Sequence, residues 1–366
     1  MSEPLPTPVR KGGVAGWLRR NLFGNPASAV ATVLLGAALA WAVPRALHWT
    51  LTGAVFRADE AACRALGHHA ACWGFVAEKH RLILFGRYPY EEQWRPLVAT
   101  ALVLAMLVAT AFPRLWRRWI LSAWAVVLAV FLFLMGGGAA GLSRVDPGEW
   151  GGLPLTVLLT AVAMTASIPL GVLLALGRRS TLPLARTLAS TYVELVRGVP
   201  LITVLFVASF VFPLILPQGL PLSGLARICI AMTLFEAAYL AEVVRGGLQA
   251  LPRGQYEAAA SLGLGYWQTQ RRVILPQALV LVIPSFVNSL LSTFMDTSLV
   301  TVVSMYDLTG SLRLALGDPR WRGFFLEGYL FVAGIYFVSC LALSRYSQWL
   351  ERRLGGWARR TREARA

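Results

Sequence analysis

The sequence predicts an all-α membrane protein with about eight transmembrane helices. Of its 366 residues, 57% are hydrophobic and only 14% are charged, whereas soluble proteins average about 25% charged residues. Several uncharged apolar runs are close to or above the roughly 20 residues that one membrane-crossing helix needs. The net charge of +16 comes mostly from arginines between these runs, where positive charge sets membrane topology. This composition excludes a water-soluble globular domain, a disordered chain and a small disulfide scaffold.

The expected spans follow the apolar runs in order along the chain. Glycines and prolines cluster at residues 147–154 and mark a joint, because such residues break regular structure. Three spans precede this joint and five follow it. The run at residues 228–248 is the weakest, since it contains two glutamates and an arginine. The runs are residues 21–44, 96–113, 119–143, 150–177, 198–226, 228–248, 273–295 and 328–344.

The joint divides the chain into three predicted parts. Residues 1–145 form an N-terminal extension with three spans and one outer loop at about residues 48–95. Residues 146–350 form a core of five spans, which holds nearly all of the motif-like polar residues. Residues 351–366 form a basic tail.

Positive charge in alternate connecting segments predicts that both termini face the cytoplasm, because Lys and Arg favour that side. The first run could instead be a cleaved signal peptide, since Ala38-Leu39-Ala40 resembles a cleavage site. We expect the run to be retained, because its loss would leave an odd number of spans and place the basic tail outside. The cytoplasmic basic residues before the tail are then Arg10, Lys11, Arg19, Arg20, Arg114, Arg117, Arg118, Arg178, Arg179, Arg186, Arg197, Arg245, Arg253, Arg271 and Arg272.

The cysteines and histidines give weak signals. Cys63 and Cys72 both lie in the expected outer loop, where a disulfide can persist; they could equally be two unpaired thiols. His68 and His69 are adjacent, but no spacing typical of zinc surrounds them. We therefore expect no metal site.

A phosphate-binding loop is missing from the sequence. Such a loop needs a glycine-rich turn that ends in Gly-Lys, and neither Lys11 nor Lys79, the only lysines, follows a glycine. No Ser-His-Asp arrangement stands out. We therefore expect a chain that is not an enzyme, binds no cofactor and does not itself hydrolyse ATP. Because the basic residues are explained by topology, we expect no nucleic acid as a partner.

Two similar charged clusters lie near expected helix ends. Glu194 and Arg197 precede Gly198, and Glu242 and Arg245 precede Gly246. The three-residue spacing places each acid and its arginine on one helix face. Each pair could be a salt bridge that stabilises a helix end, or part of a gate or substrate path. The glycines that follow would let each helix end or kink there.

Carboxylates inside spans are costly and are usually functional. Glu236 lies deeper in its span than Glu242 and has no basic partner nearby in the sequence. A neighbouring span or a substrate ammonium could supply one. Asp296, Thr297 and Ser298 follow an apolar run; they could cap a half-helix or meet a zwitterionic substrate.

The connection at about residues 249–278 predicts a helical hairpin on the cytoplasmic side. Pro252 starts one short helix, two glycines turn the chain, and a second helix at residues 267–274 ends at Pro276. Ala258, Leu262 and Tyr266 share a face at four-residue spacing. The hairpin could be a plain connector, or it could press into the groove of a partner.

The residues of this hairpin resemble the EAA loop of ABC-importer permeases. The matching positions are Glu257, Ala258, Ala259, Gly263, Ile274, Leu275 and Pro276. The match departs from the family pattern by one extra residue before Ile274 and by Leu275 following it directly. In that family the loop docks on the ATP-hydrolysing subunit, so the resemblance implies the same role here.

The flanking segments resemble the polar amino-acid permeases of the histidine and glutamine type over about residues 150–350. The similar stretches include Glu194 to Pro200, Ala238 to Gly247 and Asp296 to Val300. A lysine commonly precedes the Asp-Thr-Ser-Leu run in that family, whereas this chain has Met295. The three additional spans and the outer loop make the whole chain similar to the larger, M-type membrane subunit of the bacterial general L-amino-acid transporter.

The resemblance implies a type I ABC-importer permease core of five helices, preceded by three further helices, in the bacterial inner membrane. It implies four kinds of partner: a homologous second permease subunit, a cytoplasmic P-loop ATPase dimer that binds ATP and Mg, a periplasmic amino-acid-binding protein and membrane lipid. The implied function is one half of an ATP-driven L-amino-acid import pathway. One alternative is a secondary transporter driven by an ion gradient, with Glu236 and Asp296 as coupling carboxylates. Another is a membrane anchor or channel.

Overall fold

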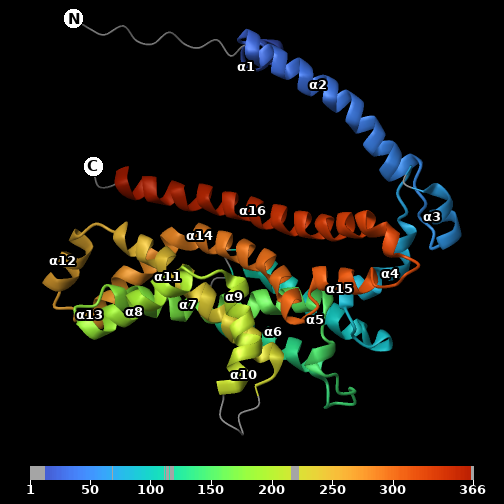
Figure 1. Ribbon diagram of the computed structural model, residues 1–366. Coiled ribbons are helices and arrows are strands. Elements are labelled where there is room, and N and C mark those ends of the chain that lie inside the picture. Colours follow the sequence, from blue (N-terminus) through green and yellow to red (C-terminus); the bar gives the residue numbers. More distant parts are fainter. Residues whose placement is uncertain are drawn as a thin grey trace, which may run out of the picture. The chain divides into compact units, whose positions relative to one another are not determined.

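The computed structural model describes residues 13–67, 69–110, 112, 115, 119–215 and 222–363. Over these residues the chain consists of helices joined by short turns and two isolated β-bridges, without a strand (Figure 1). This confirms the predicted all-α class. Several residues used in the topology and metal predictions lie outside the described residues, namely Arg10, Lys11, His68, Arg114, Arg117, Arg118 and the last three residues of the tail.

The chain divides into two compact units, Met1–Ala77 and Glu78–Ala366. The first contains α1 (Val14–Leu22), α2 (Pro26–Leu47) and α3 (Glu60–Leu66). The side chain of Asn25 accepts a hydrogen bond from the backbone N–H of Ser28, which caps α2. A disulfide joins Cys63 to Cys72, and the indole of Trp73 donates to the carbonyl of Thr50 at 2.7 Å.

The second unit begins before the predicted joint at residues 147–154. It begins at Glu78 inside α4 (Gly74–Phe85) and continues with α5 (Trp94–Thr110) and α6 (Trp119–Gly136). These helices share buried apolar side chains with α7, such as Val103, Phe131 and Leu158. Because this cluster crosses the joint, α5 and α6 pack as one unit with the helices that follow.

A fully buried arginine holds the start of α5. The guanidinium of Arg95 donates to the carbonyl of Leu134 at 2.6 Å and to that of Ser143 at 3.0 Å, and it pairs with Glu92. A second ion pair, between Lys79 and Asp318 at 2.9 Å, joins α4 to the turn after α15. Lys79 and Arg320 lower the pKa of the Asp318 carboxyl to about 2.

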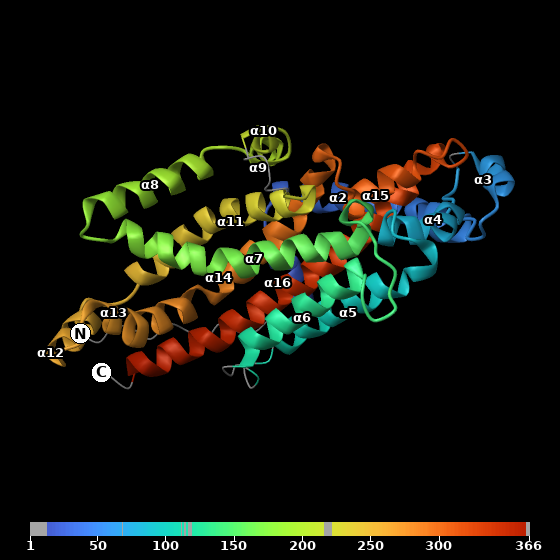
Figure 2. The same ribbon diagram turned by 90° about the horizontal axis from the view of Figure 1, so that it is seen from below.

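The core begins with α7 (Gly152–Arg178) and α8 (Pro183–Arg197), followed by α9 (Leu201–Phe206), α10 (Phe212–Ile215) and α11 (Gly224–Gln249). The hairpin contains α12 (Gly254–Ser261) and α13 (Tyr266–Thr269), and α14 (Leu275–Asp296), α15 (Leu308–Ala315) and α16 (Phe325–Glu363) complete the chain. In Figure 2, α7, α11, α14 and α16 run lengthwise through the bundle.

Six helices of the described chain are long and apolar enough to cross a membrane, or seven if α8 and the segment Leu201–Ile215 count as one bent span. We predicted about eight. Relative to a count of seven, the difference is α6 (Trp119–Gly136), of which only the segment Ser122–Gly136 is counted, as a shorter apolar helix. Its 18 residues give a length of about 27 Å, slightly less than the roughly 30 Å of the hydrocarbon core.

The span predicted at residues 198–226 is not a single helix. As predicted, α8 ends at Arg197 beside Gly198, and Pro200 precedes the next helix. The chain then bends by 103° into the segment Leu201–Ile215. Residues 216–221 lie outside the described residues.

Two predicted breaks lie elsewhere. The helix α11 runs through Gly246 and Gly247 and ends at Gln249. Pro276 does not end the second hairpin helix. It lies in the first turn of α14, which follows directly from a π-helical turn at Gln270–Ile274. The wider π-helical turn accommodates the proline ring, which would clash with a backbone carbonyl inside a regular α-helix.

Small residues bring α11 close to its neighbours. A Cβ atom added at Gly171 of α7 would lie 2.9 Å from the Cβ of Leu240, and one added at Gly247 would lie 2.9 Å from the carbonyl oxygen of Ala278 on α14. Helices in lipid gain little from hydrophobic burial, so close backbone approach through small residues supplies the packing. Both contacts therefore require glycine.

Gly247→Ala and Gly246→Ala are expected to have opposite effects on stability. Alanine favours a helix by about 1 kcal/mol at either position. At Gly247 the added methyl meets a backbone carbonyl that cannot move aside, and overpacking costs about 1–3 kcal/mol. A Cβ atom added at Gly246 would have no neighbouring atom from the rest of the structure within 4 Å. Thermal unfolding of the purified variants should show a lower midpoint for Gly247→Ala only; equal midpoints would contradict the close contact.

Candidate functional site

The predicted hairpin presents an exposed apolar tip. Gly263 makes the turn after α12 with φ +73°, a conformation that glycine adopts without strain. Leu262 is 79% exposed, and Tyr266 and Trp267 beside it are also exposed. Ala258 and Glu257 face solvent too. The predicted face therefore points away from the rest of the chain, as a docking surface would.

The root of the hairpin is anchored in the core. Ile274 and Ala259 are buried, and Ile274 packs with Val244 and Leu248 of α11. The side chain of Gln277 donates to that of Gln255 at 3.1 Å, which ties α12 to α14. Leu275 is partly buried and Pro276 is exposed. The hairpin is thus a firmly seated projection with an unpartnered tip in the described chain.

The two predicted Glu-x-x-Arg-Gly clusters meet at the ends of α7, α8 and α11. Glu242, which is 17% exposed, accepts from Arg245 at 2.6 Å, pairs with Arg178 and lies 3.5 Å from Arg197. One carboxylate therefore bridges three guanidinium groups from three helices.

Glu194 has a different partner from the predicted one. Its carboxylate lies 3.2 Å from Arg178 of α7 and is 69% exposed, and the structure shows no ion pair between Glu194 and Arg197 within the described residues. Sequence analysis missed Arg178 as the link between the clusters, because it lies on a separate helix. The clusters form one network rather than two local salt bridges.

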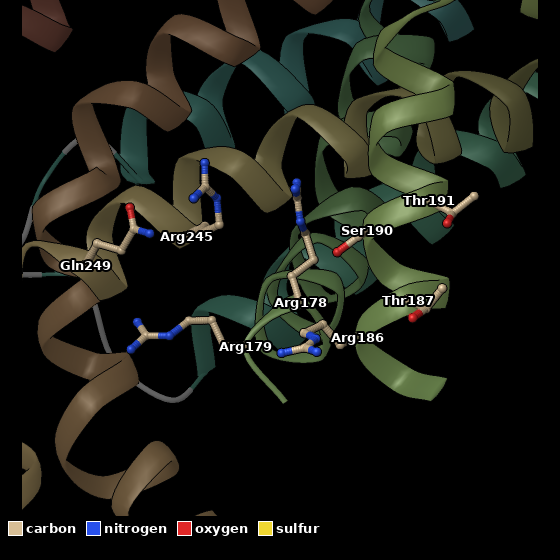
Figure 3. Close-up of a pocket in the computed structure, with 8 residues that line it drawn as sticks. All are labelled: Arg178, Arg179, Arg186, Thr187, Ser190, Thr191, Arg245 and Gln249. Carbon is tan, nitrogen blue, oxygen red and sulfur yellow. The ribbon is translucent and has the colours of Figure 1, made fainter. Parts of the chain in front are cut away.

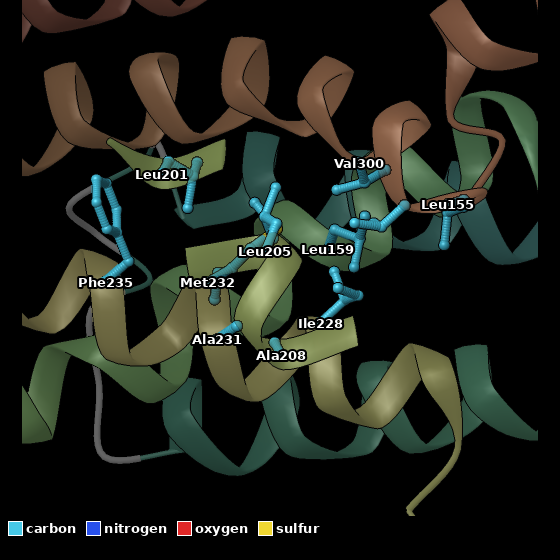
Figure 4. Close-up of a cluster of buried hydrophobic side chains, with 12 residues drawn as sticks. Leu155, Leu159, Leu201, Leu205, Ala208, Ile228, Ala231, Met232, Phe235 and Val300 are labelled. Carbon is cyan, nitrogen blue, oxygen red and sulfur yellow. The ribbon is translucent and has the colours of Figure 1, made fainter. Parts of the chain in front are cut away.

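Glu236 is buried in the middle of the bundle. Its side chain is 6% exposed, and its Oε1 atom has no hydrogen-bond partner among the described residues. The hydroxyls of Ser289 and Thr293 on α14 lie close to its carboxylate. Glu236 follows Phe235, which belongs to a buried apolar cluster from α7, α9, α11 and the segment after α14 (Figure 4). An unpartnered carboxylate oxygen beside hydroxyl groups can accept a hydrogen bond from a cation.

Asp296 is the last residue of α14 and lies three residues after Thr293, on the same helix face, and its side chain makes no capping hydrogen bond to the helical turn that follows. The capping alternative is therefore not seen for Asp296. Thr297 is buried and donates to the carbonyl of Phe294 at 2.8 Å, while Ser298 is partly buried. Of these three predicted residues, Asp296 lies near enough to Glu236 for the two carboxyl groups to interact electrostatically.

Asp307 was not among the residues predicted from the sequence. This buried residue accepts from the backbone N–H of Gly310 and the hydroxyl of Thr301, each at 2.8 Å, and from Tyr336 of α16 at 3.2 Å. Burial raises the pKa of its carboxyl, and the donated hydrogen bonds oppose the rise. Its place before a short apolar helix is an N-cap signal that could have identified it.

The fold and these sites define a multi-pass transport subunit of a membrane assembly. The chain belongs to the family of binding-protein-dependent transport system inner membrane components, which matches residues 167–356. It is a membrane permease subunit of an ABC importer, and such a permease is a transport subunit rather than an enzyme.

Two relatives match nearly the whole chain. The inner membrane amino-acid ABC transporter permease protein YhdY of Escherichia coli K12 is 44% identical over 96% of this chain and 95% of its own length. The glutamate/glutamine/aspartate/asparagine transport system permease protein BztC of Rhodobacter capsulatus is 37% identical over 97% and 96%. A solved structure, described as an amino acid ABC transporter with histidines, is 31% identical with a TM-score of 0.50 and covers 55% of this chain and 92% of that chain.

Glu242→Gln is expected to destabilise the protein far more than Glu194→Gln. Removal of the charge at Glu242 leaves three neighbouring guanidinium groups without their shared partner, which costs about 3 kcal/mol when the site is largely buried. The exposed pair of Glu194 contributes at most about 1 kcal/mol. Unfolding of both variants in detergent micelles measures the difference. Equal free energies of unfolding would show that the network does not hold the helix ends together.

Proposed function

We propose that this chain forms one half of the transmembrane pathway of an ATP-driven importer of L-amino acids. The exposed, firmly rooted hairpin carries the proposal, because a membrane protein that worked alone would have no use for an apolar tip outside the membrane. The names of both full-length relatives support amino acids as the cargo. The other half would be a homologous permease subunit.

The hairpin would couple ATP hydrolysis to transport. We assign the docking contact to Leu262, Tyr266 and Trp267, with Glu257 at the edge of the same surface. The partner would be a cytoplasmic P-loop ATPase dimer, which binds the ATP and Mg. This assignment puts the basic hairpin end of the core in the cytoplasm, and the count of about eight spans with the arginines between them supports the same side for both termini. A periplasmic amino-acid-binding protein would then deliver the substrate to the opposite end.

The carboxylate of Glu236 would meet the ammonium group of the substrate. Its unpartnered Oε1 atom and the nearby hydroxyls of Ser289 and Thr293 are supporting observations. Asp296 would contribute further negative charge to the same region. The substrate carboxylate needs a donor, which a helix end or the second subunit would supply.

The network around Glu242 would close the pathway at the hairpin end. It joins the ends of α7, α8 and α11 through Arg178, Arg197 and Arg245. Movement of the hairpin relative to these ends would strain the shared carboxylate contacts. The network therefore fits a gate that resists opening until ATP is bound.

Leu262→Asp is expected to uncouple transport without unfolding the spans. The variant places a charge on the exposed apolar tip, whereas Ser261→Asp places the same charge on the preceding, polar position as a matched control. In vesicles that contain the complete transporter, Leu262→Asp should release the ATPase subunit and lower ATP-driven uptake at least about tenfold, which corresponds to about 1.4 kcal/mol of lost contact. Gly263→Trp should do the same, because φ +73° strains any other residue. Uptake at the wild-type rate in Leu262→Asp would contradict the docking role.

Glu236→Gln is expected to lower substrate uptake while the protein stays folded. The substitution keeps the shape of the side chain and removes the charge that would pair with an ammonium group, a loss of about 2 kcal/mol or roughly thirtyfold in affinity. The thermal midpoint should not fall, because burial of an unpaired charge costs free energy. Uptake assays in the complete transporter, with Ser289→Ala as a milder variant, measure this. Unchanged uptake would restrict Glu236 to a structural role.

A further inference from the structure

An open pocket of about 390 Å³ lies where α7 and α11 end and α8 runs beside them (Figure 3). In Figure 3, the pocket residues of α11 lie on one side and the hydroxyl groups of α8 on the other, with arginine side chains between them. Because α7 and α11 are both long enough to cross the membrane, the pocket lies at the membrane surface. Its lining residues are Arg178, Arg179, Arg186, Thr187, Ser190, Thr191, Arg245 and Gln249.

The pocket has more positive charge than its carboxylates neutralise. Arg178 and Arg245 are paired with Glu242. Within the described residues, Arg179 and Arg186 form no ion pair, and Arg179 only stacks over the ring of Tyr256 at 5.7 Å. Two guanidinium groups beside three hydroxyls are therefore available to an external anion. Planar guanidinium donors match the oxygens of a phosphate group.

The helix that lines the pocket is amphipathic. Its threonine and serine side chains, Thr187, Ser190 and Thr191, line the pocket, while Leu184, Leu188 and Leu195 are exposed. The leucines follow one another at intervals of four and seven residues, which places them on one face. Because α8 runs beside two helices that are long enough to cross the membrane, an apolar face that it leaves exposed is suited to contact with lipid acyl chains, while its polar face lines the pocket. A phosphate group attached to acyl chains would use both faces, whereas free phosphate would use only the polar one.

We propose that this pocket binds the phosphate group of an anionic phospholipid. Arg179 and Arg186 contact the phosphate oxygens, the hydroxyls of Thr187 and Ser190 donate hydrogen bonds to them, and the exposed leucines of α8 contact the acyl chains. Basic pockets between membrane helices bind such headgroups in other proteins. The bound lipid would brace α8 against α7 and α11, next to the network around Glu242.

The test uses the full-length protein in detergent and measures bound phosphatidylglycerol by native mass spectrometry. The double variant Arg179→Gln/Arg186→Gln is expected to bind this lipid about tenfold more weakly, because each basic residue near the headgroup contributes to the attraction. The control variant Arg271→Gln/Arg272→Gln removes the same charge from exposed positions outside the pocket and should bind as the wild type does. Equally weakened lipid binding in both double variants would show that the lipid responds only to general surface charge, and this result would overturn the proposal.

A second arm distinguishes a lipid from free phosphate. Leu184→Ser/Leu188→Ser removes the acyl-chain contact and keeps the arginines, so it should also weaken binding of phosphatidylglycerol. Inorganic phosphate, added to protein in nanodiscs of phosphatidylcholine, should not raise the thermal midpoint, whereas inclusion of phosphatidylglycerol should. A midpoint raised by inorganic phosphate and unaffected by phosphatidylglycerol would overturn the lipid assignment. A midpoint that responds to neither would overturn the site itself.

Discussion

The close approach of α11 to α7 and α14 is the constraint on which the rest of the core depends. In lipid, a helix gains little from hiding apolar side chains, so the contact must come from packing of backbone against backbone. Alanines on α11, such as Ala237, Ala238 and Ala241, are fully buried, and Gly171 and Gly247 remove the side chains that would separate the helices. A short interhelical distance brings the polar side chains of α11 within reach of its neighbours. The same helix can therefore carry Glu236 in its middle and Glu242 near its end.

The two glutamates of α11 have opposite surroundings, and the difference follows from their depth. Glu242 lies near the end of the helix, where arginines from three helices converge on its partly exposed carboxylate, so its charge is well compensated. Glu236 lies about nine Å deeper along the axis, given six residues at 1.5 Å each, among hydroxyl groups and apolar side chains. A buried carboxylate with an unpartnered oxygen is costly unless a partner arrives. A paired site thus holds the helix ends together, whereas an unpaired one is suited to a transient ligand.

Much of this arrangement could be predicted from the sequence, and the failures have physical causes. Apolar runs and arginine placement predicted the helical membrane class, and the prolines and glycines predicted the end of α8 and the position of the hairpin. The local pairing of Glu242 with Arg245 follows from helix geometry, but the contact of Glu194 with Arg178 depends on tertiary packing. Pro276 was expected to end a helix, but the π-helical turn before it makes room for the proline ring, so the helix continues. Gly246 and Gly247 were expected to let α11 end or kink, whereas Gly247 admits the close approach of α14, which depends on tertiary packing.

The anchoring of the hairpin explains how a distant ATPase could act on the pathway. Ile274 at the hairpin root packs with Val244 and Leu248 of α11 and with Ala278 of α14, and this cluster is fully buried. Packed interiors transmit displacement rather than absorb it. A push on the exposed tip would therefore move the end of α11 directly, and Glu242 lies within one helical turn of Val244. Because α11 is continuous from Gly224 to Gln249, the same movement reaches Glu236, about 12 Å from Val244 along the axis. Because α11 runs unbroken through its paired glycines, one continuous helix serves the hairpin, the gate and the buried carboxylate together.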